Sequence, residues 1–246
     1  MDERLAEALQ PLCIDADTCE PYLRLAAPYQ HIVVTPYRRS DAQALIGHLN
    51  DQKVVMNLEG PPYPYLAEHA EWWLEKVLSE HGRIIQNLQN GRQPDGLPVA
   101  VIRDISHVSI AEALMIGVCC IERHNYFNTE PAGARQTALM EENAARDPGD
   151  PLIMYTVGDW LASAYHRQGI MPAVLGALMQ TWAIPRLGMK QVLACAFVGN
   201  RASIRVFEKN GFKHIGDVPD LVPMPESKGG GMRSVHVVEW RLDERK

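Results

Sequence analysis

The chain has 246 residues, 46% of them hydrophobic, which favours one large domain with a substantial core. Its formal net charge of −6 argues against nucleic-acid binding, which requires a basic face. Five cysteines without a C-x-x-C pair, an acidic N-terminus and the lack of a long apolar run predict a cytoplasmic chain in a reducing compartment, with no metal site and no membrane contact.

The first half of the chain is predicted to hold three strands and two helices behind an N-terminal extension, residues 1–29, that forms one short helix at most. In order, the elements are a strand over 31–38, a helix to about 49, a helix around 70–82, and strands over 99–105 and 113–122. Ser40-Asp41-Ala42-Gln43 has the form of a capping box at the start of the first helix. The second helix is expected to end near Gly82, ahead of a loop with Asn-Gly and Asp-Gly turn signals.

The second half is predicted to begin with a polar insertion, about residues 123–151, that holds one short helix near 136–145. The elements that follow are a strand over 153–162, a helix that ends at 185, a strand over 191–198, a helix over 200–211, and strands over 212–218 and 234–242. Asn200 is placed to cap the start of the last helix, and Gly211 to cap its end. This order predicts a mixed α/β sheet with helices on both faces and one parallel crossover.

The turn from His166 to Pro172, at the start of the helix that ends at 185, allows two interpretations. The first amides of a helix lack partners and carry partial positive charge, so a loop that exposes them can bind an anion. Gly169 would permit close approach, Arg167 adds positive charge, and Pro172 suits a first helical turn because its missing donor costs no helix bond. The same residues also serve a plain connection between a strand and a helix. Neither G-x-x-x-x-G-K-[ST] nor G-x-G-x-x-G is present, so those nucleotide loops are not indicated.

A second segment, "NRASIRVFEKNGF" over 200–212, is an ordinary amphipathic helix when taken alone. Together the two segments resemble the GNAT superfamily of acyl-CoA-dependent N-acetyltransferases, most closely its branch of ribosomal-protein N-terminal acetyltransferases. The family loop follows [Q/R]-x-x-G-x-[G/A], which Gly169 matches and from which His166 and Met171 depart. The second family pattern, N-x-x-S-x-x-[apolar]-x-E-K-x-G-F with the apolar offset read loosely, is matched by Asn200, Ser203, Val206, Glu208, Lys209, Gly211 and Phe212.

This resemblance spans about residues 31–242 and implies a GNAT domain over 30–246 after the 1–29 extension. The implied fold is a mixed, mostly antiparallel sheet with a splayed pair of parallel strands, and acetyl-CoA binds in the gap as cosubstrate. Its pyrophosphate would accept hydrogen bonds from the turn, and its pantetheine arm would pair with the preceding strand. The residues so implied in acetyl-CoA binding are Trp160, Leu161, Ala162, Arg167, Gly169, Ile170, Met171, Asn200 and Ser203.

The implied reaction is direct attack of a primary amine on the thioester carbonyl, and several side chains are candidates for the proton transfers. Phe207 stands where many relatives carry a Tyr acid, which leaves Ser203 as the candidate acid. Asp159 is the first candidate base, with Glu59 and Glu112 as alternatives. Each of these side chains also has an ordinary structural interpretation.

The sequence does not distinguish a small-molecule amine from a protein N-terminus as the acceptor. A homodimer is among the expected oligomeric states. Tyr63 and Tyr65 either shape an acceptor pocket or pack against the following helix. The substitution at Phe207 and the altered loop motivate an alternative, an acyl-CoA-binding module of the same fold with weak or no activity. A third hypothesis is an unrelated α/β enzyme whose helix N-terminus binds another anion.

Overall fold

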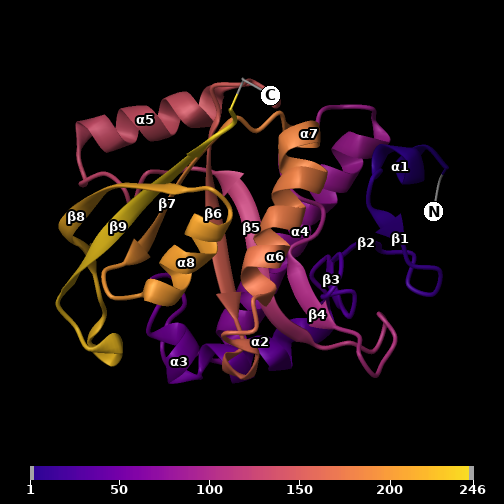
Figure 1. Cartoon of the computed structure of the whole chain (residues 1–246), viewed down its shortest axis with the longest axis horizontal. Coiled ribbons are helices and arrows are strands. Elements are labelled where there is room, and N and C mark those ends of the chain that lie inside the picture. Colours follow the sequence, from indigo (N-terminus) through magenta and orange to yellow (C-terminus); the bar gives the residue numbers. More distant parts are fainter. Residues whose placement is uncertain (1–2, 244–246) are drawn as a thin grey trace.

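A sheet in the order β1-β2-β3-β4-β5-β6-β7-β9-β8 runs through the molecule (Figure 1). The computed structural model describes residues 3–243, and residues 1–2 and 244–246, at the ends of the predicted extension and domain, lie outside it. The strands are β1 Cys13–Ile14, β2 Pro21–Arg24, β3 Ile32–Thr35, β4 Val101–Asp104, β5 Met115–Arg123, β6 Met154–Leu161, β7 Gln191–Phe197, β8 Lys213–Pro223 and β9 Met232–Arg241. The α-helices are α1 Glu3–Ala8, α2 Ala42–Leu49, α3 Gln52–Val55, α4 Ala67–Gln89, α5 Ala134–Ala145, α6 Ile170–Leu178, α7 Ile184–Leu187 and α8 Arg201–Lys209.

Helices pack on both faces of the sheet, which confirms the predicted α/β class (Figure 1). On one face α2 and α4 bury Leu45 and Leu74 against β4 and β5. On the other face α6 and α8 bury Leu178 and Phe207 against β6, β7 and β9. Within residues 3–243 no helix is long and apolar enough to span a bilayer.

One neighbouring pair in the sheet is parallel, and this pair determines where a ligand can enter. β6 and β7 pair at Met154–Gln191 and Tyr155–Val192, whereas β5–β6 and β7–β9 pair antiparallel over seven positions each. Beyond Tyr155 the two parallel strands diverge, and α6 connects them across one face (Figure 1). The predicted mostly antiparallel sheet with a splayed parallel pair is therefore confirmed.

The N-terminal extension contributes two strands that the sequence did not predict. β2 pairs with β3 through Leu23–Val34 and Arg24–Val33, and β1 adds a two-residue ladder at the sheet edge. Such short strands carry too little periodicity to be recognised locally, because their stability comes from the neighbouring strand. The predicted short helix is present as α1, and the helix predicted within the insertion is present as α5.

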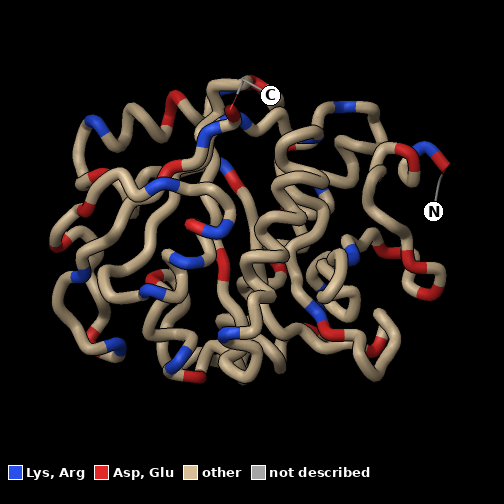
Figure 2. Tube along the Cα trace, viewed as in Figure 1, with Lys and Arg blue, Asp and Glu red and all other residues tan. Residues whose placement is uncertain are grey.

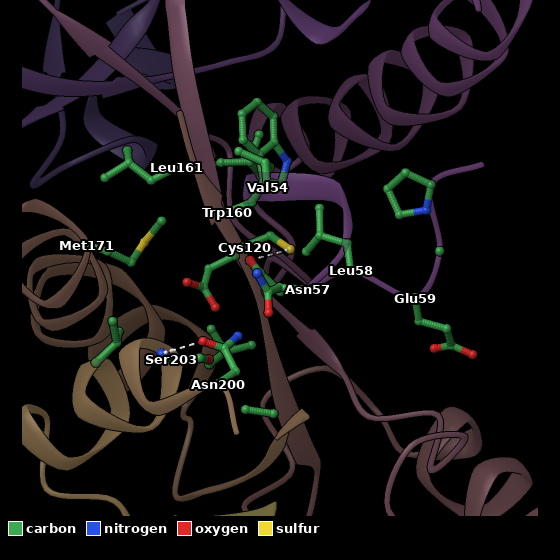
Figure 3. Close-up of a pocket in the computed structure, with 18 of the residues that line it drawn as sticks. Val54, Asn57, Leu58, Glu59, Cys120, Trp160, Leu161, Met171, Asn200 and Ser203 are labelled. Carbon is green, nitrogen blue, oxygen red and sulfur yellow. Dashed lines mark hydrogen bonds between the residues drawn. The ribbon is translucent and has the colours of Figure 1, made fainter. Parts of the chain in front are cut away.

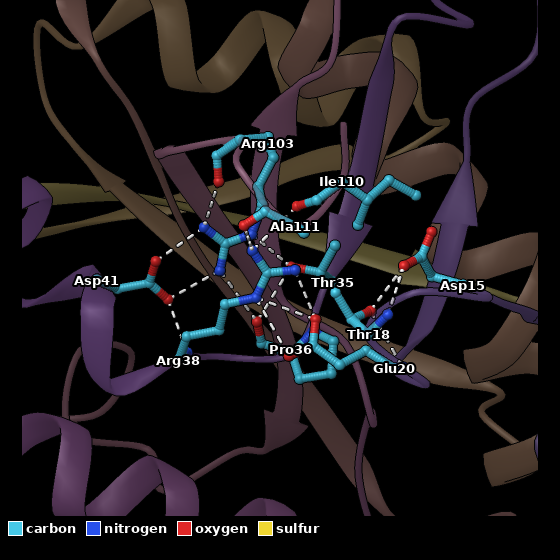
Figure 4. A network of polar contacts seen from close by, with 11 residues as sticks. Asp15, Thr18, Glu20, Thr35, Pro36, Arg38, Asp41, Arg103, Ile110 and Ala111 are labelled. Atoms are coloured by element: carbon cyan, nitrogen blue, oxygen red, sulfur yellow. Dashed lines mark hydrogen bonds and ion pairs between the residues drawn. The ribbon is translucent and has the colours of Figure 1, made fainter. Parts of the chain in front are cut away.

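A buried polar network replaces the predicted capping box at the start of α2 (Figure 4). Asp41, and not Ser40, precedes the helix, and its carboxylate accepts from both terminal nitrogens of Arg103 at 2.8 and 2.9 Å. Arg103 and Asp41 are almost fully buried, which makes the ion pair costly to break from one side. Arg38 meanwhile binds Glu20 at 2.6 Å and thereby fastens the extension to the sheet. The capping-box prediction was wrong because Asp41 serves this long-range pair.

Two helices extend beyond their predicted ends. α4 continues through Gly82 to Gln89, because Leu88 is buried and Ile84 and Ile85 pack against the same core. After α6, a π-helical turn over Met179–Ala183 leads into α7, so helical structure ends at Leu187 rather than at Pro185. Basic and acidic positions are interspersed along the described trace (Figure 2).

Candidate active site

A cavity of about 1140 Å³ opens where β6 and β7 diverge. Figure 3 shows Met171, Asn200 and Ser203 on one side of it, and Leu58 and Glu59 on the opposite side. Other lining residues come from β5 to β7, from α2 to α4, from the Pro-rich loop (residues 57–66) and from the segments that follow β3 and β5: Tyr37, Leu45, Lys53, Asn57, Tyr65, His69, Trp72, Trp73, Cys120, Glu122, Asn128, Asp159, Trp160, Leu161, Cys195 and Phe197. The cavity is thus shared by both halves of the chain.

Strand register determines which backbone groups of β6 face this gap. The Ala162 N–H donates to Ile116 O at 2.7 Å, and Met154 O accepts from His124 N–H at 2.9 Å. In an antiparallel ladder the direction of the backbone groups alternates, so the even-numbered residues of β6 point toward β5. Asp159 and Leu161 consequently present their N–H and C=O groups to the gap.

Of the three residues whose backbone is expected to pair with a pantetheine arm, Trp160, Leu161 and Ala162, this geometry leaves Leu161 facing the gap. Leu161 has its N–H on the gap side, while its carbonyl accepts from His166 Nε2 at 2.8 Å. Trp160 lines the cavity with its side chain but turns its backbone toward β5. Ala162 is buried and does not line the cavity.

The turn before α6 exposes a run of backbone donors. Arg167 and Gly169 adopt positive φ angles of 64° and 78°. Tyr29 donates its hydroxyl to Gln168 O at 2.9 Å and so fixes the turn. No acceptor in residues 3–243 bonds to the five amides from Arg167 to Met171. Because these amides stand at the positive end of a helix, the turn has the properties of an anion site.

The start of α8 forms the neighbouring wall. Asn200 caps the helix, since its Oδ1 accepts from the Ser203 N–H at 3.2 Å. This bond leaves the Ser203 hydroxyl at the cavity wall (Figure 3). Phe207, one turn later, is buried against Phe212 with ring centroids 5.1 Å apart and offers no proton.

Asp159, the first candidate base, lies in the cavity. Its carboxylate forms no hydrogen bond or ion pair with the described residues, and burial raises the pKa of Asp159 to about 6. A carboxylate with this pKa is ionised at neutral pH and still basic enough to accept a proton. Burial also raises the pKa of the Cys120 thiol and brings that of Cys195 to about 12, which favours the protonated thiol over the nucleophilic thiolate.

The two alternative bases lie in different places. Glu59 lines the far side of the cavity, where its Oε2 accepts from Asn128 Nδ2 at 2.6 Å. Glu112 lies before β5, outside the lining residues, and its Oε2 accepts from the Ser109 hydroxyl at 2.8 Å. The structure brings Asp159 and Glu59 to one cavity and leaves Glu112 outside it.

The Pro-rich loop is held by a residue that sequence reasoning missed. Lys228, in the β8–β9 connection, is 1% exposed and donates from Nζ to Leu58 O at 2.7 Å and to Glu59 O at 3.0 Å. Nothing in "ESKGGG" signals this role, because the contact spans most of the chain. Of the two loop tyrosines, Tyr65 both lines the cavity and packs in the core, whereas Tyr63 does neither.

The sequence model of the acetyltransferase (GNAT) domain family matches residues 31–213. The chain therefore belongs to the GNAT acetyltransferase family, as its two motifs predict. A search of curated proteins finds no match.

Solved acetyltransferases share the fold. The chain is similar to RimL, a ribosomal L7/L12 alpha-N-protein acetyltransferase in complex with coenzyme A, at 18% identity over 90% of this chain and 98% of that one, with a TM-score of 0.59. It is also similar to Mycobacterium smegmatis RimJ in complex with CoA-disulfide, at 18% identity, with coverage of 92% and 88% and a TM-score of 0.56. A third is the microcin C7 self-immunity acetyltransferase MccE in complex with acetyl-CoA and AMP, at 15% identity, with coverage of 87% and 93% and a TM-score of 0.54. At 15–18% identity, these likenesses show a shared fold.

Proposed function

We propose that this protein transfers an acetyl group from acetyl-CoA to a primary amine by direct attack within a ternary complex. One cavity brings together the unpaired amides of four residues at the start of α6, the gap-facing backbone of Leu161 and the carboxylate of Asp159, and this convergence carries the proposal. Solved acetyltransferases of the same fold hold CoA or acetyl-CoA, which supports the same cosubstrate here.

Acetyl-CoA is proposed to enter with its pyrophosphate on the amides of Arg167, Gly169, Ile170 and Met171. The pantetheine arm follows the gap edge of β6, and the thioester end lies near Ser203. Basic positions on α8 add positive charge beside the phosphates, since Arg205 and Lys209 line the same cavity. Arg205 already pairs with Glu208 at 3.0 Å, so Lys209 is better placed than Arg205 to meet a phosphate, in addition to Arg167 of the turn.

In the proposed reaction the amine nitrogen attacks the thioester carbonyl carbon, and the N–H of Leu161 stabilises the resulting oxyanion. An alkylamine with a pKa near 10.4 is unprotonated in roughly one molecule in a few thousand at pH 7, a cost of about 4–5 kcal/mol. Asp159 accepts that proton, directly or through water. An α-amine with a pKa near 7.8 costs only about 1 kcal/mol, so it depends less on the base.

Collapse of the tetrahedral intermediate breaks the C–S bond and expels the CoA thiolate. With a thiol pKa near 8.5, leaving the thiolate unprotonated costs only about 2 kcal/mol at pH 7. The Ser203 hydroxyl supplies a proton or a hydrogen bond at this step. The missing Tyr therefore lowers the rate without preventing the reaction.

Release of free thiol from acetyl-CoA, measured over a broad panel of amines, tests this function. The panel includes peptides with free N-termini, because several structural neighbours are named for ribosomal proteins, together with polyamines and amino sugars. The second candidate, a CoA-binding module, is favoured by the buried Phe207. Calorimetry with CoA separates the two: binding without thiol release on any amine supports the module, and release supports the enzyme.

A further inference from the structure

Three polar side chains converge on the sheet edge, outside the acetyl-transfer cavity. His214 Nε2 and His236 Nδ1 each lie 2.6 Å from the same Oδ1 of Asp217. The three candidate ligand atoms lie within 4.8 Å of one another, and none of these residues lines the cavity. β8 is the edge strand of the sheet, so no further strand in the described part of the chain pairs with it beyond the cluster (Figure 1).

A β-bulge produces this convergence. His214 stands opposite Val238, and a regular antiparallel ladder from there would place Asp217 opposite Val235, whose side chain is buried in the core. The register instead shifts between His214 and Gly216, so Asp217 stands opposite His236. Ile215 is the extra residue and remains 55% exposed. Bulges redirect side chains in this way, and here the redirected side chain is a carboxylate between two imidazoles.

We propose that His214, Asp217 and His236 form a binding site for a divalent zinc ion. Two imidazole nitrogens and one carboxylate oxygen suit borderline transition metals, whereas Mg²⁺ and Ca²⁺ prefer oxygen ligands alone. The carboxylate charge favours a dication, and exposed fractions of 51%, 49% and 27% leave room for water as the remaining ligand. The sequence predicted no metal site because its cysteines form no C-x-x-C pair, and the three ligands proposed here include no cysteine.

Only small movements would convert the hydrogen-bonded cluster into a metal site. Ligand atoms bound about 2.0–2.2 Å from a tetrahedral zinc lie about 3.3 Å from one another. Each ring nitrogen now lies 2.6 Å from Asp217 Oδ1, so it must move away from that oxygen by less than about 1 Å. Rotation of exposed side chains provides that range. Each neutral ring would carry its proton on the nitrogen away from the metal. A bound ion would then cross-link β8 to β9 at an irregular position of the edge ladder.

Calorimetric titration of zinc into the tag-free, EDTA-treated full chain tests the site. Cys13 and Cys19 are replaced by Ser throughout, because these exposed thiols would compete for zinc. We expect one zinc per chain and a thermal midpoint that rises with zinc concentration. Loss of a ligand in His214→Gln or Asp217→Asn should weaken zinc binding at least about tenfold. Even the loss of a residue that only hydrogen-bonds to a metal ligand lowers metal affinity roughly ten- to a hundredfold.

His107→Gln is the matched control, because His107 is also an exposed histidine but lies in the loop between β4 and β5. This variant should bind zinc as the parent does. Absence of a saturable heat of zinc binding in the parent would overturn the proposal. Equal affinity in the parent, His214→Gln and Asp217→Asn would do the same. Neither result depends on acetyl transfer, so the proposed function is tested separately.

Discussion

Replacing Asp159 with Asn tests both the proposed base and the cost of holding a carboxylate in the cavity. Burial raises the pKa of Asp159 from its ordinary 3.8 to about 6. A group whose pKa is higher in the folded state binds protons more tightly there, so it destabilises the fold as pH rises from about 3.8 to about 6. At about 1.4 kcal/mol per pKa unit, the ionised carboxylate lowers the free energy of unfolding by about 3 kcal/mol at pH 7.

The Asn variant should therefore be more stable and less active. Its free energy of unfolding at pH 7, from urea denaturation, should exceed that of the parent by up to about 3 kcal/mol, and the gain should vanish below about pH 4. Its kcat on an alkylamine should fall by about 10²- to 10⁴-fold. The parent's kcat/KM should rise with pH through about 6 as Asp159 ionises, and this step should be absent from the variant.

Glu112→Gln is the control, because Glu112 is a carboxylate outside the cavity. It should leave kcat and the pH profile unchanged. An Asp159→Asn variant with the parent's rate and pH profile would refute the assignment of the base. A variant less stable than the parent at pH 7 would refute the argument from burial.

Three further substitutions follow from the same structure. Gly169→Glu should reduce CoA affinity nearly a thousandfold by calorimetry, because the new carboxylate and the CoA pyrophosphate, about 4 Å apart, would repel each other by about 4 kcal/mol. Gly91→Glu is the control: its φ of 67° is similar, it lies away from the cavity, and it should not change CoA affinity. Lys228→Met should raise KM for the amine several-fold while KM for acetyl-CoA stays constant, since the two lost bonds hold the Pro-rich loop on the side of the cavity opposite the turn before α6. Equal changes in both KM values would contradict this role. Arg103→Met should lower the free energy of unfolding by about 3–5 kcal/mol, because Asp41 remains buried and unpaired; a loss below 1 kcal/mol would contradict it.

Local patterns predicted most of the fold, and the failures involve tertiary contacts. Gly82 indicated a helix end because glycine disfavours helix by about 1 kcal/mol. Packing of Leu88 against the core outweighs that preference and carries α4 onward. The ion pair of Asp41 with Arg103 joins residues 62 apart in sequence, so no local motif reports it.

The candidate site likewise combines local motifs that the sequence predicts with residues that only tertiary contacts bring in. The turn at Gly169 and the cap at Asn200 are local motifs, and the structure brings both to the cavity. Lys228 and Asn128 meet the Pro-rich loop from more than 60 residues away, so no spacing in the sequence pairs them. The site at Asp217 depends on a bulge, and the sequence pattern of β8 does not reveal which residue is extra.

Thiol release from acetyl-CoA over the amine panel is the most direct test of acetyl transfer in this cavity. At least one primary amine should release thiol well above the rate without amine, and Gly169→Glu should lose that release while Gly91→Glu keeps it. Tight binding of CoA with thiol release at background for every amine would contradict an acetyltransferase. Release that persists in Gly169→Glu would contradict the placement of acetyl-CoA on the turn before α6.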